Sequence, residues 1–237
     1  MTRDLSFLAG IYPILDAAWL QQHLREEDWP IAERIRLVRD MENAGIRLLQ
    51  LRCKSSLDQA TAFFERWLKV LRSEMEQVRV ILNDHVSLAL KLQADGVHVG
   101  QDDTPIAECR ALLGPDLLIG LSTHNRAEVE DSLATSADYI GFGPLFQTSS
   151  KPDAQIPSGL DGLKIACRFG QKPIVAIGGI QPEHLSRIAF CGAHAAAMIS
   201  GLWGTNGRFL IGQCVREFAR GLENRYGNFN YSAEHSE

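Results

Sequence analysis

Acidic side chains follow two short apolar runs of this chain, at the point where each run ends. Asp84 closes the run 79 to 84, and Asp102 and Asp103 follow the run 96 to 100 after one intervening residue. Carboxylates repel one another and need water, so their position at the ends of buried strands calls for a cation. Two carboxylates that share a site with water and phosphate oxygens are a usual way for proteins to hold Mg²⁺. The spacing therefore makes these aspartates candidate magnesium ligands.

Further polar side chains follow the other apolar runs in the same way. They are Arg52 and Lys54 at the end of the second run, Asn83 at the end of the third, Gln101 after the fourth, Ser122, Thr123, His124 and Asn125 at the end of the fifth, and Thr148, Ser149, Ser150 and Lys151 after the sixth. A guanidinium binds phosphate oxygens in pairs, and an ammonium binds them as a point charge. Together with the carboxylates, the cations Arg52, Lys54 and Lys151 predict a site for a magnesium diphosphate.

The seventh and eighth runs end in "GGI" and "MISG", which offer backbone amides rather than charged side chains. Glycines after strands let main-chain N–H groups approach an anion closely. The hydroxyls at 148 to 150 are expected to reach the same place. The two ends therefore predict a second phosphate site.

Each of these residues, taken singly, has a structural alternative. Asp84 could cap a helix that starts near Val86, an arrangement worth about 1 kcal/mol. Lys54 and Lys151 could be solvated, and His98 is expected to face the barrel rather than a ligand. Asp95 is expected to be a turn residue. Only the joint placement favours a functional site.

The apolar runs predict strands, and amphipathic segments lie between them. The eight runs cover 10 to 16, 47 to 53, 79 to 84, 96 to 100, 117 to 123, 138 to 146, 173 to 179 and 195 to 200. Nearly continuous apolar character is typical of parallel strands covered on both faces. Eight alternations favour an α/β protein of the (β/α)8 TIM barrel type, in which the residues after the strands form the active site. A doubly wound sheet is the alternative.

The clearest helix begins at Ser56, with Gln59 placed for a capping box. A second begins at Pro182 and ends near Cys191 and Gly192, and the last is expected over 207 to 226. No change in composition divides the chain. We expect one catalytic barrel domain over 1 to 226 and a polar C-terminal tail over 227 to 237.

Composition narrows the range of partners. The chain has 237 residues and a net charge of −5, so no overall basic field favours nucleic acid or an anionic membrane. The five cysteines show no metal-binding or disulfide spacing. No run approaches the roughly 20 apolar residues of a membrane helix, and the N-terminus does not look like a signal peptide. We therefore expect a cytoplasmic protein that binds small molecules.

Seven segments, in this order and spacing, resemble the thiamine-phosphate synthase family. They are "QLRCK", "LND", "ADGVHVGQDD", "GLSTHN", "ADYIGFGPLFQTSSK", "IVAIGGI" and "AAAMIS". The resemblance runs from about residue 10 to 203. It implies a (β/α)8 barrel, usually a cytosolic homodimer, that joins a hydroxymethylpyrimidine diphosphate to a thiazole phosphate and releases diphosphate. Where the thiazole substrate is carboxylated, the reaction of the family also releases CO2.

The resemblance also implies roles for individual residues. The pyrimidine diphosphate would be held by Gln50, Leu51, Arg52, Cys53, Lys54, Asn83, Ser122 and Lys151. Asp84 and Asp103 would ligate Mg²⁺. Thr148, Ser149 and Ser150, with Gly179, Ile199 and Ser200, would hold the thiazole phosphate. Among these, Arg52, Lys54, Lys151 and Ser122 are the expected catalytic residues, because they would stabilise the departing diphosphate.

Two features depart from the family pattern. The loop at 148 to 151 reads Thr-Ser-Ser-Lys where the family usually has Thr-x-Thr-Lys, and the segment 17 to 30 is longer than typical. Two other functions stay open. One is a thiazole tautomerase, in which His124 would transfer a proton, and the other is a non-catalytic barrel that binds thiamine precursors. The retained cations and carboxylates favour the synthase.

Overall fold

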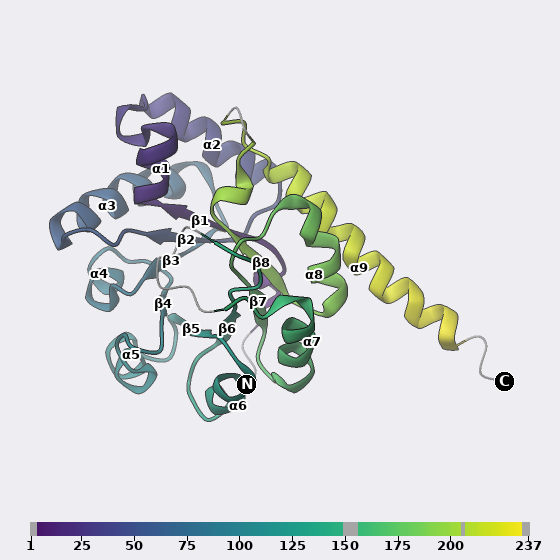
Figure 1. Cartoon of the computed structure of the whole chain (residues 1–237). Coiled ribbons are helices and arrows are strands. Elements are labelled where there is room, and N and C mark those ends of the chain that lie inside the picture. Colours follow the sequence, from purple (N-terminus) through teal and green to yellow (C-terminus); the bar gives the residue numbers. More distant parts are fainter. Residues whose placement is uncertain (1–3, 149–155, 205–206, 234–237) are drawn as a thin grey trace.

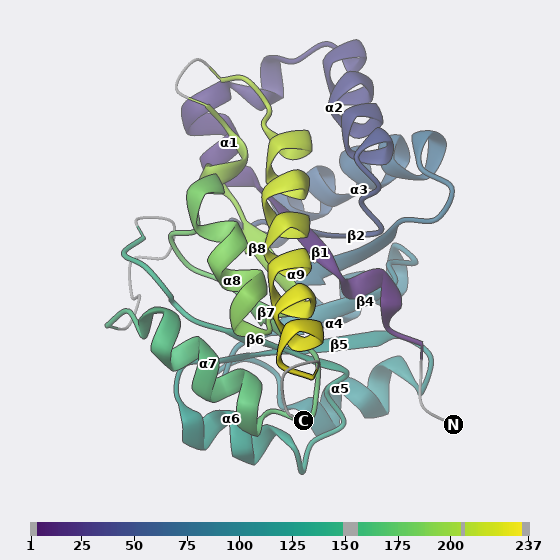
Figure 2. The same ribbon diagram turned by 90° about the vertical axis from the view of Figure 1, so that its right-hand side faces the viewer.

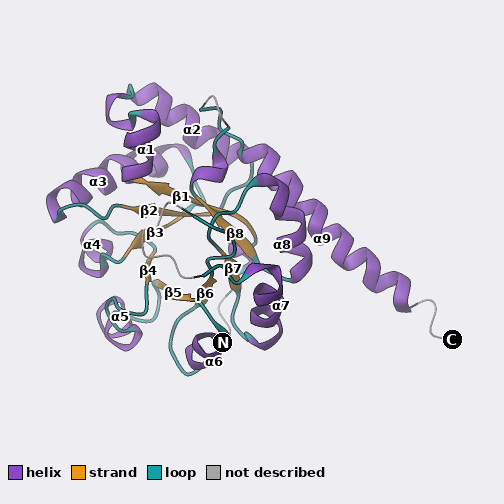
Figure 3. Ribbon diagram, in the orientation of Figure 1, coloured by secondary structure: helices purple, strands orange, loops and turns teal. Residues whose placement is uncertain are grey.

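Eight parallel strands close into a barrel in chain order, and helices surround it (Figures 1 and 3). The computed structural model describes residues 4–148, 156–204 and 207–233. Every strand pairs with its neighbour in the chain, and β8 returns to β1. The predicted (β/α)8 barrel is confirmed, and the doubly wound alternative is excluded.

The strands lie inside or close to the predicted apolar runs. They are β1 Gly10–Asp16, β2 Leu48–Arg52, β3 Arg79–Asn83, β4 Gly96–Val99, β5 Leu118–Thr123, β6 Tyr139–Phe142, β7 Ile174–Ala176 and β8 Ala195–Met198. Their residues are almost all buried on both faces, as parallel strands between two apolar layers require.

The helices follow the strands around the outside of the barrel. They are α1 Ala17–Leu24, α2 Ile31–Asn43, α3 Leu57–Glu74, α4 Val86–Lys91, α5 Ile106–Leu113, α6 Arg126–Ser132, α7 Gly159–Phe169, α8 Leu185–Cys191 and α9 Ile211–Ala233, with short 3-10 turns η1 Ser6–Leu8, η2 Glu26–Asp28, η3 Pro182–His184 and η4 Ser200–Leu202. The expected capping box is present at α3, where Ser56 and Gln59 bond each other's backbone N–H groups. None of the helices in the described ranges is long and apolar enough to cross a membrane.

Two apolar layers hold the barrel together. The inner layer fills the barrel and includes Tyr12, Ile81 and Tyr139. The outer layer lies between strands and helices, and its largest side chains, such as Phe64 and Trp67, are fully buried. Side chains on a strand alternate between these layers, so neighbouring residues of one strand have different surroundings.

The N-terminal end of the barrel is tied by side chains that cap strand amides. Asp95, directly before β4, accepts from Val80 N of β3 at 2.7 Å. Asp138, directly before β6, accepts from Ile119 N of β5 at 2.8 Å. His194, directly before β8, accepts through Nδ1 from Ile174 N of β7 at 3.2 Å. Asp95 is thus a structural residue that joins two strands, in line with its expected structural role.

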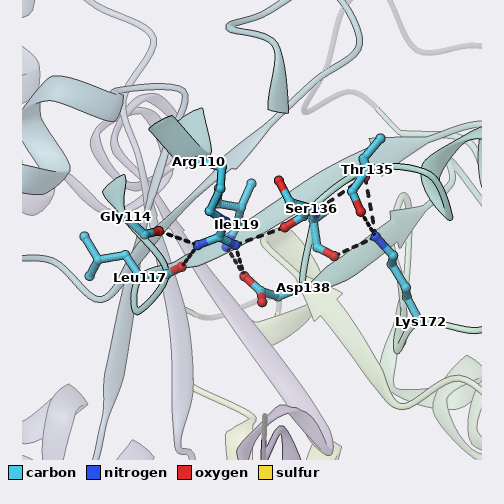
Figure 4. A network of polar contacts seen from close by, with 9 residues as sticks. Arg110, Gly114, Leu117, Ile119, Thr135, Ser136, Asp138 and Lys172 are labelled. Carbon is cyan, nitrogen blue, oxygen red and sulfur yellow. Dashed lines mark hydrogen bonds and ion pairs between the residues drawn. The ribbon is translucent and has the colours of Figure 1, made fainter. Parts of the chain in front are cut away.

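Two cationic side chains, Arg110 and Lys172, add hydrogen bonds at this N-terminal end of the barrel, called the lower end below (Figure 4). Arg110 of α5 donates to Asp138 and to the carbonyls of Gly114, Leu117 and Ser136. Lys172, before β7, donates to the carbonyls of Thr135 and Ala137. These bonds satisfy backbone oxygens where strands begin, on the face of a barrel that serves stability.

The segment 17 to 30 forms α1 and η2 and packs on the barrel through charge and aromatic contacts. Glu26 is 1% exposed and accepts from Arg34 at 2.7 Å and from Arg66 at 3.1 Å. Trp19 stacks on Trp203 with ring centroids 5.8 Å apart. The additional residues are therefore an ordered part of the fold.

The last helix differs from the expectation. It begins at Ile211 rather than 207 and continues to Ala233, past the point where we expected a polar tail (Figure 1). Gly227 does not end it, since one glycine inside a helix costs only about 1 kcal/mol. α9 runs alongside α8 (Figure 2), and Gly221 lies so close to the Ser186 carbonyl that a side chain would not fit.

Candidate active site

A cavity opens at the C-terminal ends of the strands, and all eight strands or the loops after them contribute to its wall. The predicted residues on this wall are Gln50, Arg52, Lys54, Asn83, Asp84, Asp103, Ser122, Thr148, Gly179, Ile199 and Ser200. The fold therefore brings together residues that are up to 150 positions apart in the chain.

Two of the residues expected to hold the pyrimidine diphosphate do not reach the cavity. The side chains of Leu51 and Cys53 are 0% and 3% exposed and belong to the outer apolar layer. They alternate with Gln50 and Arg52 and so point toward the helices instead of the substrate. Their side chains cannot contact a ligand in the cavity. Ser149, Ser150 and Lys151 lie outside the described residues.

Arg52 is positioned by an acidic residue that the sequence reading did not single out. Its guanidinium donates to Asp16, the last residue of the neighbouring strand β1. The other oxygen of Asp16 accepts from Trp19 N at the start of α1, at 2.8 Å. Asp16 is 4% exposed. A buried carboxylate therefore fixes both the entry to α1 and the direction of Arg52.

Lys54, Asp84 and Asp103 form one charged group on the wall. Lys54 forms an ion pair with Asp84. Burial raises the pKa of the Asp84 carboxyl above its ordinary value, the Lys54 ammonium opposes this shift, and the nearby Asp103 carboxyl adds to it. Two carboxyl groups close enough to disturb each other's ionisation favour a cation between them.

The capping alternative for Asp84 is not what the structure shows. His85, not Asp84, is the residue before α4, and it makes no side-chain cap. Asp84 has φ 63°, a left-handed conformation that is uncommon outside glycine, asparagine and aspartate. The strained backbone turns the carboxyl toward Lys54 and the cavity, which supports a functional interpretation.

The donor set fits a hydrated Mg²⁺ better than a metal held by protein alone. Nowhere in residues 4–148, 156–204 and 207–233 do three or more His, Cys, Asp or Glu side chains gather into a metal site. Asp84 and Asp103 both line the cavity, and Asp103 also accepts from Gly100 N at 2.7 Å. Mg²⁺ commonly takes one or two carboxylates and completes its shell with water and substrate phosphates.

A chain of polar side chains runs through the barrel beneath these residues. Gln50 Nε2 donates to Tyr12 Oη at 3.2 Å, and the Tyr12 and Tyr139 hydroxyls are 2.9 Å apart. The Tyr139 hydroxyl lies 3.1 Å from His98 Nδ1, and His98 Nε2 lies 3.0 Å from Ser122 Oγ. His98 faces the barrel, as expected. The tyrosines were missed because, within apolar strands, they are typical of core residues.

His124 lies on the wall beside a carboxylate. Its Nδ1 and its backbone N–H both lie 2.9 Å from Glu128 Oε2. Glu128 also accepts from the Asn125 side chain, while Asn125 caps α6. The spacing of four residues between His124 and Glu128 is the only signal for this pair in the sequence.

The opposite wall is made of backbone. Gly178 and Gly179 follow β7 with φ 98° and 62°, which L side chains rarely adopt. A Cβ at Gly179 would overlap the backbone of Phe146 and Gln147, so only glycine lets the two loops approach. Phe146 N donates to Gly178 O at 3.0 Å and joins the loop after β6 to the loop after β7. Main-chain groups, rather than charges, thus dominate this side.

Comparison with known proteins assigns the family. Residues 23–202 match the family described as thiamine monophosphate synthase. The thiamine-phosphate synthase of Pelotomaculum thermopropionicum is 40% identical over 72% of this chain and 78% of its own length. The chain belongs to the thiamine monophosphate synthase family.

Two further comparisons support the family. The thiamine-phosphate synthase of Syntrophomonas wolfei is 38% identical over 83% of this chain and 90% of its own length. The solved structure of a thiamine phosphate pyrophosphorylase from Pyrococcus furiosus superposes with a TM-score of 0.73 at 26% identity, over 94% of this chain and 99% of that one. The chain is thus a transferase of the thiamine monophosphate synthase family on a barrel that the family shares.

Proposed function

We propose that this thiamine-phosphate synthase joins 4-amino-2-methyl-5-(diphosphooxymethyl)pyrimidine to a thiazole phosphate, giving thiamine monophosphate and diphosphate. The observation that supports the proposal most is the composition of one cavity. Arg52, Lys54 and a carboxylate pair lie on one side of it, and glycine backbone lies on the other. A diphosphate with its cation suits the first side, and a single phosphate suits the second.

The diphosphate would lie against Arg52, Lys54, Asn83 and Ser122. Bond breaking is easier when the charge that develops on the leaving group meets groups already in place. Asp16 holds Arg52 ready for this task before substrate binds. Asp84 and Asp103 would hold Mg²⁺, which would supply further neutralisation of the leaving diphosphate when bound. Lys151, outside the described residues, is proposed for the same role on the grounds of family resemblance.

The chain offers positioning rather than a nucleophile. Departure of diphosphate leaves a pyrimidinylmethyl cation that the aminopyrimidine ring stabilises, and the thiazole nitrogen then forms the new carbon–nitrogen bond. Apolar wall residues, among them Ile14, Val175 and Met198, would keep water from the cation. His124 is not needed as a base for these steps, because no proton has to be removed from the attacking nitrogen.

The thiazole phosphate would lie where Gly179, Ile199, Ser200 and Thr148 meet. Backbone N–H groups and hydroxyls bind a phosphate without adding charge. This arrangement would separate the single phosphate from the cations that bind the diphosphate. The two substrates would then face each other across the middle of the cavity.

Two broader expectations are carried forward from the family. We propose that the enzyme is a homodimer and that it works in the cytoplasm. Sedimentation of the purified protein tests the first, and fractionation of cells that contain it tests the second. A purely monomeric species at micromolar concentration would contradict the dimer.

The deciding experiment incubates the purified protein with both substrates and Mg²⁺ and follows thiamine monophosphate and diphosphate together. We expect equal amounts of the two products, loss of turnover with EDTA, and recovery with added Mg²⁺. Binding of both substrates without product would overturn the synthase in favour of a binding protein. Conversion of the thiazole alone would indicate a tautomerase that uses His124.

A further inference from the structure

We propose that Tyr12, Tyr139 and His98 form a buried relay of hydrogen bonds that sets Ser122 as a donor and Gln50 as an acceptor toward the substrate. The relay joins Gln50 and Ser122 through Tyr12 and His98, which are buried at the inner surface of the cavity, and through Tyr139, which does not line it. Its members act as positioning residues. The inference rests on the proposed function for the identity of the ligand, but its direction follows from the contacts alone.

The sequence makes room for the relay with two glycines. Gly120 pairs in register with both His98 and Tyr139, and a Cβ there would overlap the two rings. A Cβ at Gly141 would lie 3.1 Å from His98 Cε1. Small residues on β5 and β6 therefore admit two large polar rings into the barrel. A core built only for stability would fill this space with aliphatic side chains, as other positions of the inner layer do.

The direction of the relay follows from counting protons. A tyrosine hydroxyl donates one hydrogen bond, and burial raises the pKa of both Tyr12 and Tyr139, so both keep their protons. Gln50 Nε2 donates to Tyr12, which leaves the Tyr12 proton for Tyr139. Tyr139 then donates to His98 Nδ1, and His98 carries its own proton on Nε2. Ser122 Oγ accepts that proton.

The opposite donor–acceptor order leaves a buried hydroxyl proton without an acceptor. If Tyr139 donated to Tyr12, the Tyr12 hydroxyl would accept two bonds, and its own proton would be left over in a place that is 2% exposed. Reversing the whole relay instead would require the Gln50 amide to turn over. The two ends are therefore coupled: when Gln50 offers its oxygen to the cavity, Ser122 offers its hydroxyl proton.

This pattern matches a ligand with a donor at one end and an acceptor at the other. The amino group of an aminopyrimidine would donate to Gln50 Oε1. An oxygen of the diphosphate would accept from the Ser122 hydroxyl. A ring with an oxo group in place of the amino group would place an acceptor against Gln50 Oε1, which is also an acceptor, and would bind less well. The relay thus links recognition of the ring to stabilisation of the leaving group.

The test begins with the tautomer of His98 in the ligand-free protein. Nitrogen-15 NMR distinguishes Nδ1–H from Nε2–H, and His98→Asn identifies the signal among the seven histidines. We expect Nε2–H in the wild type at pH 8. Tyr12→Phe should leave it unchanged because Tyr139 still donates, whereas Tyr139→Phe should shift the signal. An Nδ1–H tautomer in the wild type would overturn the relay, whether or not the protein makes thiamine monophosphate.

Kinetics then test whether the relay acts through Ser122. Tyr139→Phe should lower kcat/KM about tenfold when Ser122 is present and less than about twofold in a Ser122→Ala background, as expected for residues of one network. Circular dichroism should show the same fold for both variants. Equal losses in the two backgrounds would show that Tyr139 supports the barrel and not Ser122, and would overturn the positioning role.

Discussion

Asp16 and Arg52 are joined across adjacent strands, and their pairing connects the first helix of the barrel to the cavity. One oxygen of Asp16 accepts from the N-terminus of α1, and the other accepts from Arg52. The side chain of Arg52 is 17% exposed and that of Asp16 is 6% exposed. A cation at the edge of the cavity thus has a fixed direction before any anion arrives, which reduces the ordering that binding requires.

Asp16→Asn should test this pairing. The amide keeps the size of the side chain and can still cap α1, but it no longer opposes the charge of Arg52. We expect kcat/KM to fall about tenfold, or about 1.4 kcal/mol. Asp28→Asn is the control, because Asp28 lies in η2 and its partner Arg25 is 81% exposed. Equal activity of wild type and Asp16→Asn would show that Asp16 is not needed to position Arg52.

Asp103→Ala and Asp102→Ala should differ strongly. Asp103 lines the cavity and lies beside Asp84, whereas Asp102 is exposed and outside the cavity wall. Loss of a magnesium ligand should lower kcat at fixed Mg²⁺ about a hundredfold, and the concentration of Mg²⁺ that gives half-maximal activity should rise. Asp102→Ala should keep both values. If the two variants behave alike, the choice of Asp103 as a ligand is wrong.

Glu26→Gln should destabilise the protein more than any surface change nearby. The carboxylate is buried between Arg34 and Arg66, and its removal leaves a buried guanidinium without a counter-charge. A loss of about 3 kcal/mol in the free energy of unfolding is expected, measured by urea denaturation. Glu27→Gln, an exposed neighbour, should change it by less than about 0.5 kcal/mol.

His194 should make stability depend on pH. Burial lowers the pKa of its imidazole, and the positive charge of Arg225 lowers it further. Its Nδ1 must be unprotonated to accept from Ile174 N. The unfolded chain binds the proton near pH 6.5, so stability is full above this pH. It declines as pH falls below it, by at most about 1.4 kcal/mol per pH unit.

His194→Asn is the matched control for that dependence. The asparagine oxygen can accept the same bond and does not titrate. Urea denaturation at pH 8 and pH 5.5 should therefore show a larger drop for the wild type than for the variant. Parallel losses would assign the pH dependence to other groups.

The strands were predictable because each is a short apolar run between polar segments. The rim residues were predictable because a barrel places the ends of its strands at one face. The partners of these rim residues were not predictable. Asp16 bonds Arg52 and Lys54 bonds Asp84 between the ends of different strands, and no local pattern in the sequence indicates either pair. Tyr12 and Tyr139 were missed for another reason, since an aromatic residue in a buried strand is normally core.

Helix boundaries were less predictable than strands. α9 runs through Gly227, where we expected a polar tail to begin, because one glycine inside a helix costs only about 1 kcal/mol. The family resemblance implies ligand contacts for each of residues 50 to 54. Leu51 and Cys53 face the helices instead, as strand geometry requires.

The side chains that tie the lower end of the barrel divide it into two-strand modules. Asp95 joins β4 to β3, Asp138 joins β6 to β5, and His194 joins β8 to β7. Each tie is contained within one strand–helix–strand unit and uses nothing from the cavity. Asp95 and Asp138 also accept from Arg72 of α3 and Arg110 of α5, so a unit that can be exchanged between relatives as a block includes the helix before its first strand. Recombinant chains with junctions between modules should fold more often than chains cut inside one.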